Sequence, residues 1–455
     1  MKNYIKIICV VFFVGFFCSC EKYLEKKSNQ SLVIINTLGD LQALLDNVGI
    51  INLQGPSADL ASSDDNFIRF NDFQALVSQE DRNLYTWQPS NVFLPYTVSP
   101  NDWARLYNTI YVANVVLDNI DKIEKTSQNL ASWNNVKGQA LFTRAHCFFK
   151  LLTIWSLAYD ETNSNEDLGI PLRQSSDFNK LSIRANVKDS YDLVTEDLES
   201  ASGLLSTSPI HPYRAGKGAA FGLLSRVYLS MRKYDAALRS SESSLAITNT
   251  LVDYNTLSSV AAFPIPQFNK EVIYACSTDG GPLLNRNRAR VDTTLIRKYE
   301  TNDLRRQIFF DTQADGTCIF KGSYEGKITL FNGISVNEIL LTRAECKVRA
   351  GLITEGLADL NTLLKNRYKT GTFTGISGLS TQESLTRILL ERQKELVMRG
   401  TRWIDIKRLN KENANIGLRR ILNSNTFTLP PNDLRFALAI PEDVVSLGQI
   451  PQNPR

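Results

Sequence analysis

Histidine and the short metal-binding motifs are nearly missing from this sequence. Its 455 residues include two histidines, His146 and His211, and neither belongs to a His-x-x-x-His pair. Cys-x-x-Cys is missing as well, so the paired ligands typical of zinc sites are lacking. The chain also has no Gly-x-Ser-x-Gly turn and no phosphate-cradling glycine loop. We therefore expect no cofactor, no catalytic metal and no nucleophilic enzyme, and we expect His146 to be structural.

Long hydrophobic runs are missing after the first twenty residues. The apolar run Ile7 to Phe17 follows Lys2 and Lys6 and is eleven residues long. A transmembrane helix needs roughly 20 residues, so this run is too short to span a bilayer. It has the layout of a secretory signal, and we expect no transmembrane segment in the mature protein.

Cysteine is concentrated where this run ends, in Cys18-Ser19-Cys20. Small residues are preferred next to a cleavage point, and Ser19 before Cys20 meets that preference. The segment resembles a lipoprotein signal, although Phe17 stands where the usual pattern has leucine. The resemblance implies that residues 1–19 are removed and that Cys20 carries the membrane lipid. The alternative is an ordinary cleaved signal that leaves Cys20 as a free thiol.

The other cysteines and the charges indicate little chemistry. Four scattered cysteines, at 147, 276, 318 and 346, do not form a disulfide framework, and Cys147 and Cys346 fall in apolar helical patterns. The formal net charge is +4, and no run of five like charges occurs. We therefore expect no nucleic-acid partner.

Helical periodicity begins after a polar stretch at 20–36, which we interpret as a tether. Leu38, Leu41 and Leu45 share one helical face, so the first ordered element is predicted to begin at Thr37. Asp102 is predicted to cap a helix that runs to about Ile120. Further apolar stripes follow at 140–155 and 187–205.

Two later segments, 219–247 and 336–364, each read as a helix, a short turn and a second helix. They resemble the tetratricopeptide hairpin, and about four such pairs fit the chain. The prediction is an all-α, tetratricopeptide-like solenoid forming a single domain over 37–455. Long stretches without periodicity interrupt it at 57–101, 160–184, 251–335 and from 410 onward, and those at 57–101 and 251–335 are the main insertions. Loops this long are usually functional.

One segment carries a family signature: Glu391-Arg392-x-x-Glu395-Leu396, then Gly400-x-Arg402-Trp403 and Asp405-x-x-Arg408. It resembles the SusD/RagB pattern, with Arg399 where that family usually has glutamate. Ser380 and Glu383 fit a capping box before it, and Gly400 is suited to a left-handed helix end. Glu391 and Glu395 share a helix face, and we expect Arg402 and Arg408 to be their partners.

Four other segments agree with the family in the same order: 103–114, 142–149, 340–345 and the chain's end at 440–454. The resemblance implies an outer-membrane, surface-exposed lipoprotein. Such proteins bind nutrient oligomers, mostly glycans and in some relatives peptides, for a SusC-like TonB-dependent barrel, and carry out no chemistry. Two other functions stay open, a polysaccharide hydrolase and a periplasmic tetratricopeptide adaptor.

The candidate ligand-binding residues lie in the aromatic stretch 83–96. Tyr85 and Trp87 would project on one side of an extended segment, with Gln88 and Asn91 as polar selectors. Flat rings pack on sugar faces while amides select hydroxyl groups. The alternative is that these rings anchor the loop to the scaffold. A weaker candidate of the same kind contains Tyr299, Arg305 and Phe309.

Two pairs of carboxylates are candidate chemical sites. Glu391 and Glu395 point the same way from one helix, so they cannot flank a glycosidic bond and are predicted to be structural. Asp64 and Asp65 could ligate calcium, but adjacent carboxylates in a loop are more often a turn or cap. No metal site is predicted.

Overall fold

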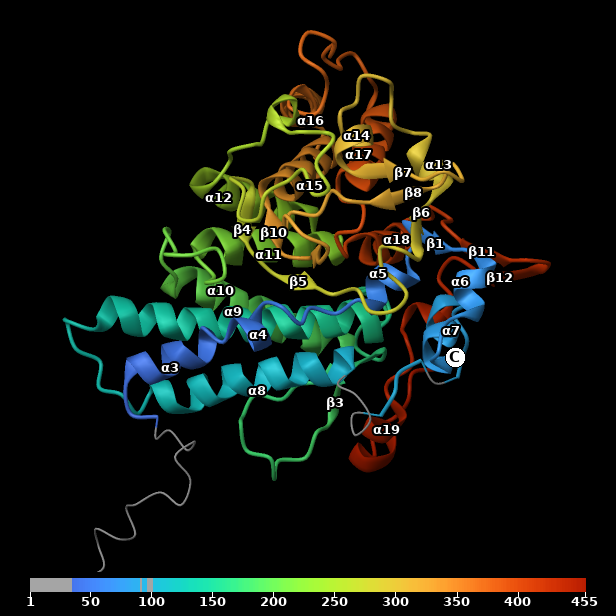
Figure 1. Cartoon of the computed structure of the whole chain (residues 1–455). Coiled ribbons are helices and arrows are strands. Elements are labelled where there is room, and N and C mark those ends of the chain that lie inside the picture. Colours follow the sequence, from blue (N-terminus) through green and yellow to red (C-terminus); the bar gives the residue numbers. More distant parts are fainter. Residues whose placement is uncertain (1–34, 91, 96–100) are drawn as a thin grey trace, which may run out of the picture.

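The computed structural model describes residues 35–90, 92–95 and 101–455. Helices dominate it (Figure 1). The α-helices are α3 (Leu38–Leu45), α4 (Val48–Ile51), α5 (Ala58–Ser62), α6 (Phe70–Gln74), α7 (Gln79–Tyr85), α8 (Asp102–Ile120), α9 (Leu130–Trp155), α10 (Val187–Leu204), α11 (Lys217–Ser230), α12 (Tyr234–Ile247), α13 (Thr293–Ile296), α14 (Arg305–Ile308), α15 (Val336–Arg349), α16 (Ile353–Lys365), α17 (Thr381–Glu395), α18 (Arg402–Asn410) and α19 (Glu442–Gly448).

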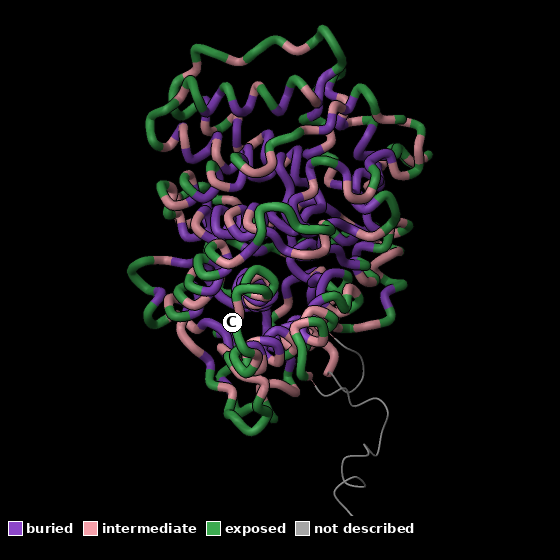
Figure 2. The backbone as a smooth tube through the Cα atoms, turned by 90° about the vertical axis from the view of Figure 1, so that its left-hand side faces the viewer, coloured by how far each residue is buried: buried purple, intermediate pink, exposed green. Residues whose placement is uncertain are grey.

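The long helices stack on one another in chain order. α8 packs on α9, α9 on α10, α10 on α11 and α11 on α12, and α15 then joins α12 to α16 and α17. Figure 1 shows this stack rising from α8 and α9 at the bottom to α16 at the top. α9 is buried over most of its length, since every residue from Gly138 to Trp155 is buried. In Figure 2 the buried backbone forms a continuous interior through the stack.

Both predicted helical hairpins are present. α11 and α12 are joined through Arg232, which has a φ of 62°, and α15 and α16 through Gly351, which has a φ of 82°. Positive φ values favour glycine, so Gly351 suits its turn better than Arg232 does. Ser380 and Glu383 form the predicted capping box of α17. Thr37, where the first ordered element was predicted to begin, also forms a capping box, at the start of α3.

The all-α prediction is too restrictive, because the long excursions contain short strands. The described residues form six two-stranded antiparallel sheets. The pairs are β1 (Asn66–Ile68) with β6 (Ala289–Val291), β2 (Leu168–Pro171) with β3 (Arg184–Asn186), β4 (Val272–Tyr274) with β10 (Ile334–Ser335), β5 (Ser277–Thr278) with β9 (Leu330–Phe331), β7 (Phe310–Thr312) with β8 (Cys318–Phe320), and β11 (Leu418–Leu422) with β12 (Asn425–Leu429). The β1–β6 pair holds the insertions at 57–101 and 251–335 side by side.

Two predicted helix boundaries are wrong. Asn101, not Asp102, caps α8, and its side chain accepts the N–H of Ala104 at 2.9 Å. Asp102 instead accepts the N–H groups of Ser57 and Ala58, at 2.8 and 3.0 Å. Gly400 does adopt a left-handed conformation, with a φ of 70°, but α17 has already ended at Glu395.

Cys147, Cys276, Cys318 and Cys346 are buried free thiols. Within the described part of the chain, no helix is both long enough and apolar enough to cross a membrane. Cys20 and most of the predicted tether lie outside the described residues.

Candidate functional site

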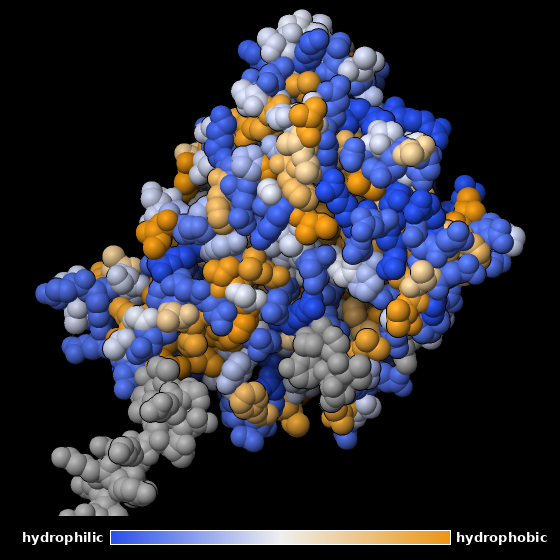
Figure 3. Space-filling model, in the orientation of Figure 1, coloured by the Kyte–Doolittle hydropathy of each residue, from blue (hydrophilic) through white to orange (hydrophobic). Residues whose placement is uncertain are grey.

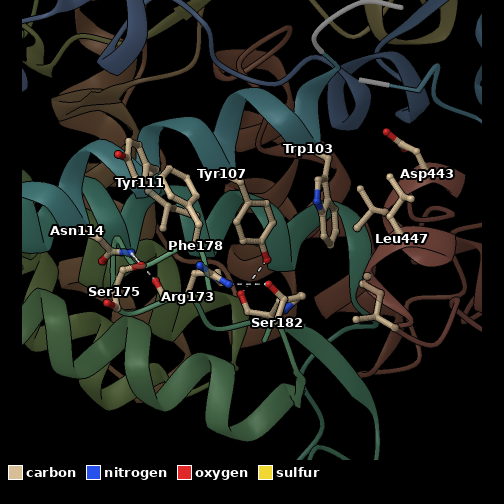
Figure 4. A pocket seen from close by; sticks show the side chains of 15 residues that line it. Trp103, Tyr107, Tyr111, Asn114, Arg173, Ser175, Phe178, Ser182, Asp443 and Leu447 are labelled. Atoms are coloured by element: carbon tan, nitrogen blue, oxygen red, sulfur yellow. Dashed lines mark hydrogen bonds between the residues drawn. The ribbon is translucent and has the colours of Figure 1, made fainter. Parts of the chain in front are cut away.

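An elongated groove runs along one side of α8, and its volume is about 510 Å³. α8 forms the floor, the segment 171–182 forms a side wall, and α19 with the residues after it lies at the end of the groove next to Trp103 (Figure 4). We call it the α8 groove. Its lining residues are Trp103, Tyr107, Ile110, Tyr111, Asn114, Pro171, Arg173, Ser175, Phe178, Ser182, Asp443, Val444, Leu447, Gly448 and Ile450.

A row of aromatic residues forms the floor of the α8 groove. Trp103, Tyr107 and Tyr111 are spaced four residues apart, which puts them on one face of α8 at steps of about 6 Å. The ring centroids of Trp103 and Tyr107 are 5.0 Å apart. Trp103 also packs edge-on against Trp155 of α9, at 5.1 Å. The row is therefore anchored in the core at its Trp103 end.

At its other end the row meets a ring from the opposite wall. Phe178 stacks on Tyr111 with centroids 4.9 Å apart and an interplanar angle of 26°. Phe178 is 76% exposed and Tyr111 is 36% exposed. In Figure 4 the two rings lie side by side over the groove. This end therefore offers a ring surface to solvent.

The polar groups of the groove are mostly engaged within the protein. The Tyr107 hydroxyl donates to the carbonyl of Pro171 at 2.8 Å, and burial raises the pKa of Tyr107 well above its ordinary value. The Asn114 amide donates to the carbonyl of Arg173 at 2.7 Å and accepts from Arg144 at 3.1 Å. The Arg173 guanidinium donates to groups of its own loop. The groove thus combines apolar ring faces with few ionic groups, which suits an uncharged ligand.

A second hollow of about 420 Å³ lies between the insertions at 57–101 and 251–335. Its lining is more strongly charged: Glu80, Asp81, Arg105, Asp102, Asp279 and Arg288. Burial raises the pKa of Asp102 to about 6. Phe93 is the aromatic residue on this lining. The second hollow is therefore lined mainly by charged side chains, whereas the α8 groove is lined mainly by aromatic and aliphatic ones.

Comparisons with known proteins address the family of the chain. Residues 22–229 match a family model described as starch-binding associating with outer membrane, and residues 336–436 match the model of the SusD family. The chain belongs to the SusD/RagB family. The first matched range contains α8 and the 171–182 wall of the groove, whereas α19 lies beyond both ranges.

Solved structures of other SusD proteins share the fold. A SusD superfamily protein from Bacteroides thetaiotaomicron superposes with a TM-score of 0.74 at 22% identity, over 92% of this chain and 100% of its own. A SusD-like carbohydrate binding protein from Bacteroides vulgatus gives 0.67 at 22% identity, over 91% and 97%. A laminarin binding SusD-like protein gives 0.64 at 17% identity, also over 91% and 97%. No curated protein matches the sequence.

In this SusD/RagB protein the two aromatic residues predicted to bind ligand are buried. Tyr85 ends α7 and is 2% exposed, and Trp87 follows in a turn and is 1% exposed. The Tyr85 hydroxyl accepts the N–H of Ile68 at 2.9 Å, and the Trp87 indole donates to the carbonyl of Ser62 at 3.1 Å. The prediction that both rings project from an extended segment is wrong, because Tyr85 ends a helix, Trp87 lies in a turn, and both rings are buried in the core.

The polar selectors predicted beside these rings have different outcomes. Gln88 is half-buried, and its backbone carbonyl accepts from Arg455 at 2.9 Å. It does not line either hollow. Asn91 lies outside the described residues. A role for Gln88 or Asn91 in ligand binding stays a prediction.

The weaker candidates Tyr299, Arg305 and Phe309 are also buried. Arg305 contacts Glu391 at 2.6 Å and Glu395 at 3.1 Å in a fully buried ion cluster. The expected partners of these glutamates are wrong, because Arg402 pairs with Asp64 and Arg408 with Glu345. Arg305 belongs to the insertion at 251–335, and folding brings it next to Glu391 and Glu395 of α17. Because the two segments are far apart in the sequence, their spacing could not predict this contact.

Asp64 and Asp65 belong to a structural contact between the start of the fold and α18. Burial raises the pKa of Asp64, but Arg402, at 2.7 Å, more than compensates, so the net shift is downward. Asp65 accepts the N–H of Met398 at 3.2 Å. Among the residues that the structure describes, no group of three His, Cys, Asp or Glu side chains could hold a metal ion.

The α8 groove was not predicted, because the sequence pattern of its aromatic residues is the same as that of a buried helix face. Trp103, Tyr107 and Tyr111 have the spacing of a buried helix face, and Trp103 is in fact buried. A usable clue lay further along the chain, in the apolar residues Phe178, Leu181 and Ile183 within an otherwise polar loop.

Proposed function

We propose that this SusD/RagB protein binds nutrient oligomers, glycans in the first place, and delivers them to a SusC-like TonB-dependent transporter without chemical conversion. The observation that carries the proposal is the aromatic row of α8, which ends in the solvent-exposed Tyr111–Phe178 pair. Sugar rings have apolar faces that pack on aromatic rings, and hydroxyl groups find partners among nearby polar atoms. The relative described as laminarin binding supports a carbohydrate ligand.

Binding without catalysis is favoured by the charges of the α8 groove. A glycoside hydrolase needs two carboxyl groups that flank the bond to be cleaved. Among the lining residues of the α8 groove, Asp443 is the one carboxylate. The lining of the groove therefore lacks the acid pair. The description of the matched family model as starch-binding also favours binding over hydrolysis.

A peptide ligand is the second candidate. Val444, Leu447 and Ile450 give the groove an aliphatic wall beside α19, and apolar peptide side chains would pack there as readily as a sugar face. Tyr111 and Phe178 lie at the other end of the groove, beyond Tyr107 and Trp103 (Figure 4). Whether a glycan or a peptide binds against Tyr111 and Phe178 distinguishes the two candidate ligands.

The place of action in this proposal is the outer membrane. Lipid on Cys20 would hold the protein in the same leaflet as the mouth of the barrel. That would raise the effective concentration of one partner for the other. The family model's description, associating with outer membrane, supports this part of the proposal.

The test is retention on immobilised polysaccharides. Purified residues 21–455 are passed over laminarin, starch, an acidic polygalacturonate and a peptide matrix, and the eluates are assayed for new reducing ends. We expect retention on a neutral glycan with no new reducing ends. Released fragments would indicate a hydrolase, retention on the peptide matrix alone would indicate the second candidate, and no retention would contradict both.

A further inference from the structure

The loop between β2 and β3, residues 172–183, projects from the bottom of the helical stack beside α8 (Figure 1). We call it the arm. It carries three large apolar side chains in the open: Phe178, Leu181 and Ile183 are 76%, 88% and 76% exposed. Figure 3 shows separate hydrophobic residues at this lower edge of the molecule. Of the three, Phe178 lines the α8 groove.

The arm is braced from within by Arg173. Its guanidinium donates to the carbonyl of Asp177 at 2.7 Å, to the Ser182 hydroxyl at 3.1 Å and to the carbonyl of Lys180. These acceptors lie on both sides of Phe178 in the chain. One planar side chain with several donors therefore ties the two halves of the arm together.

The arm is also fastened to α8. The Asp118 carboxylate accepts from the Ser176 N–H at 2.8 Å and from the Ser176 hydroxyl at 2.7 Å. Asn114 donates to the carbonyl of Arg173 and accepts from Arg144 of α9, and Arg144 in turn pairs with Asp197 of α10 at 2.7 Å. The fastening thus continues through three stacked helices, and Asp118 does not itself line the groove.

We infer that Phe178 is a specificity-determining residue of the α8 groove, and that Arg173 and Asp118 are positioning residues that hold its ring against Tyr111. This inference rests on the proposed function. A ring held in place before the ligand arrives loses little conformational entropy on binding, which raises affinity. Without the braces, an exposed ring at a loop tip would be free to leave the groove.

The bracing is tested first without ligand. Trypsin cleavage after Lys180, followed by mass spectrometry, is compared for the wild type, Asp118→Ala, Asp118→Asn and Leu181→Ala. We expect Asp118→Ala to be cut at least several-fold faster than the wild type. Asp118→Asn, which keeps an acceptor oxygen, and Leu181→Ala should be cut at nearly the wild-type rate. Equal rates for all four proteins would overturn the bracing.

The role of Phe178 is tested by calorimetry with the neutral glycan that retains the wild type. Phe178→Ala should bind about tenfold more weakly, the loss typical of truncating an aromatic anchor, with an unchanged thermal midpoint. Leu181→Ala and Ile183→Ala, changes of exposed apolar residues in the same arm, should bind as the wild type does.

A double-mutant cycle separates positioning from direct contact. Asp118→Ala should weaken binding in the wild-type background and have no further effect in the Phe178→Ala background, because it acts through the ring. Additive effects would overturn the positioning role of Asp118. Wild-type affinity in Phe178→Ala would overturn the inference while leaving glycan binding intact, whereas a wild type that binds no glycan would overturn the proposed function itself.

Discussion

Trp87 and Tyr111 are both aromatic, yet the structure gives them different surroundings. Trp87 is enclosed, its indole N–H is paired, and the Arg420 guanidinium lies 5.2 Å from its ring. Tyr111 sits on the outer face of α8 and is covered in part by Phe178. Burial, rather than residue type, therefore decides which ring stabilises the fold and which can meet a ligand.

This difference predicts opposite phenotypes. Trp87→Ala should lower the free energy of unfolding by ~3–5 kcal/mol, as truncation of a buried tryptophan typically does. Trp103→Ala should behave similarly because Trp103 packs on Trp155. Tyr111→Ala should change stability by less than about 1 kcal/mol and weaken glycan binding. Urea unfolding and calorimetry measure the two effects, and a stable Trp87→Ala protein that has lost binding would reverse the assignment.

Asp102 makes stability depend on pH. Burial raises its pKa to about 6, so between pH 4 and 6 the folded protein keeps a proton at Asp102 that the unfolded chain has released. Raising the pH through this window therefore destabilises the fold through this group, by up to about 3 kcal/mol for a shift of roughly two pKa units.

Asp102→Asn removes this titration but keeps an oxygen that can accept the N–H groups of Ser57 and Ala58. We expect the stability of the variant relative to the wild type to rise as the pH goes from 4 to 7. Denaturant unfolding at several pH values measures it. Parallel stability curves for the two proteins would show that Asp102 titrates normally in the fold.

At the scale of elements, α17 is fixed by ions rather than by its apolar face alone. Arg305 bridges Asp303, Glu391 and Glu395, and all four side chains are fully buried. Lys394 also pairs with Asp303 and Glu391, and Arg367 pairs with Glu395, so the three carboxylates share three buried cations. Removing Arg305 leaves the buried cluster short of one positive charge, so Arg305→Ala should cost ~3–5 kcal/mol of unfolding free energy.

A matched control is present on the surface. Arg69 also bridges two carboxylates, those of Asp72 at 2.8 Å and Asp315 at 3.0 Å, but all three side chains are partly exposed. Surface pairs contribute about 0–1 kcal/mol, so Arg69→Ala should unfold at nearly the wild-type urea concentration. Equal destabilisation by the two variants would contradict the structural role of the buried cluster.

The helices were predictable because their signals are local. The apolar stripes of α8 and α10, the turn at Gly351 and the capping box of Ser380 and Glu383 all lie within a few turns of chain. The strands were not, since β1 and β6 have three residues each and pair across more than 200 positions. Short strands of this kind carry no periodicity long enough to detect.

The candidate site was harder to predict for the same reason. Its floor lies on α8, but Phe178 comes from the arm and Leu447 from the end of the chain, and only folding brings them together. Tyr85 and Trp87 are closer together in the sequence than the aromatic residues of α8, yet both are buried in the core. The number of aromatic residues in a segment therefore does not predict whether their side chains are exposed, because residues elsewhere in the chain determine which side chains are covered.

At the scale of the whole molecule, the fold described from residue 35 onward is separate from Cys20 in sequence. Cys20→Ala should therefore abolish membrane attachment while leaving the helical circular dichroism and the thermal midpoint unchanged. Membrane fractionation of the full-length precursor checks this. Continued sedimentation with membranes would show that another segment provides the anchor.

The central claim is that a neutral oligosaccharide binds along α8, and a crystal structure with such a ligand tests it most directly. We predict sugar rings against Tyr111 and Phe178, with the ligand running along α8 toward the aliphatic residues of α19. Ligand in the charged hollow between the insertions at 57–101 and 251–335, with an empty α8 groove, would contradict the claim.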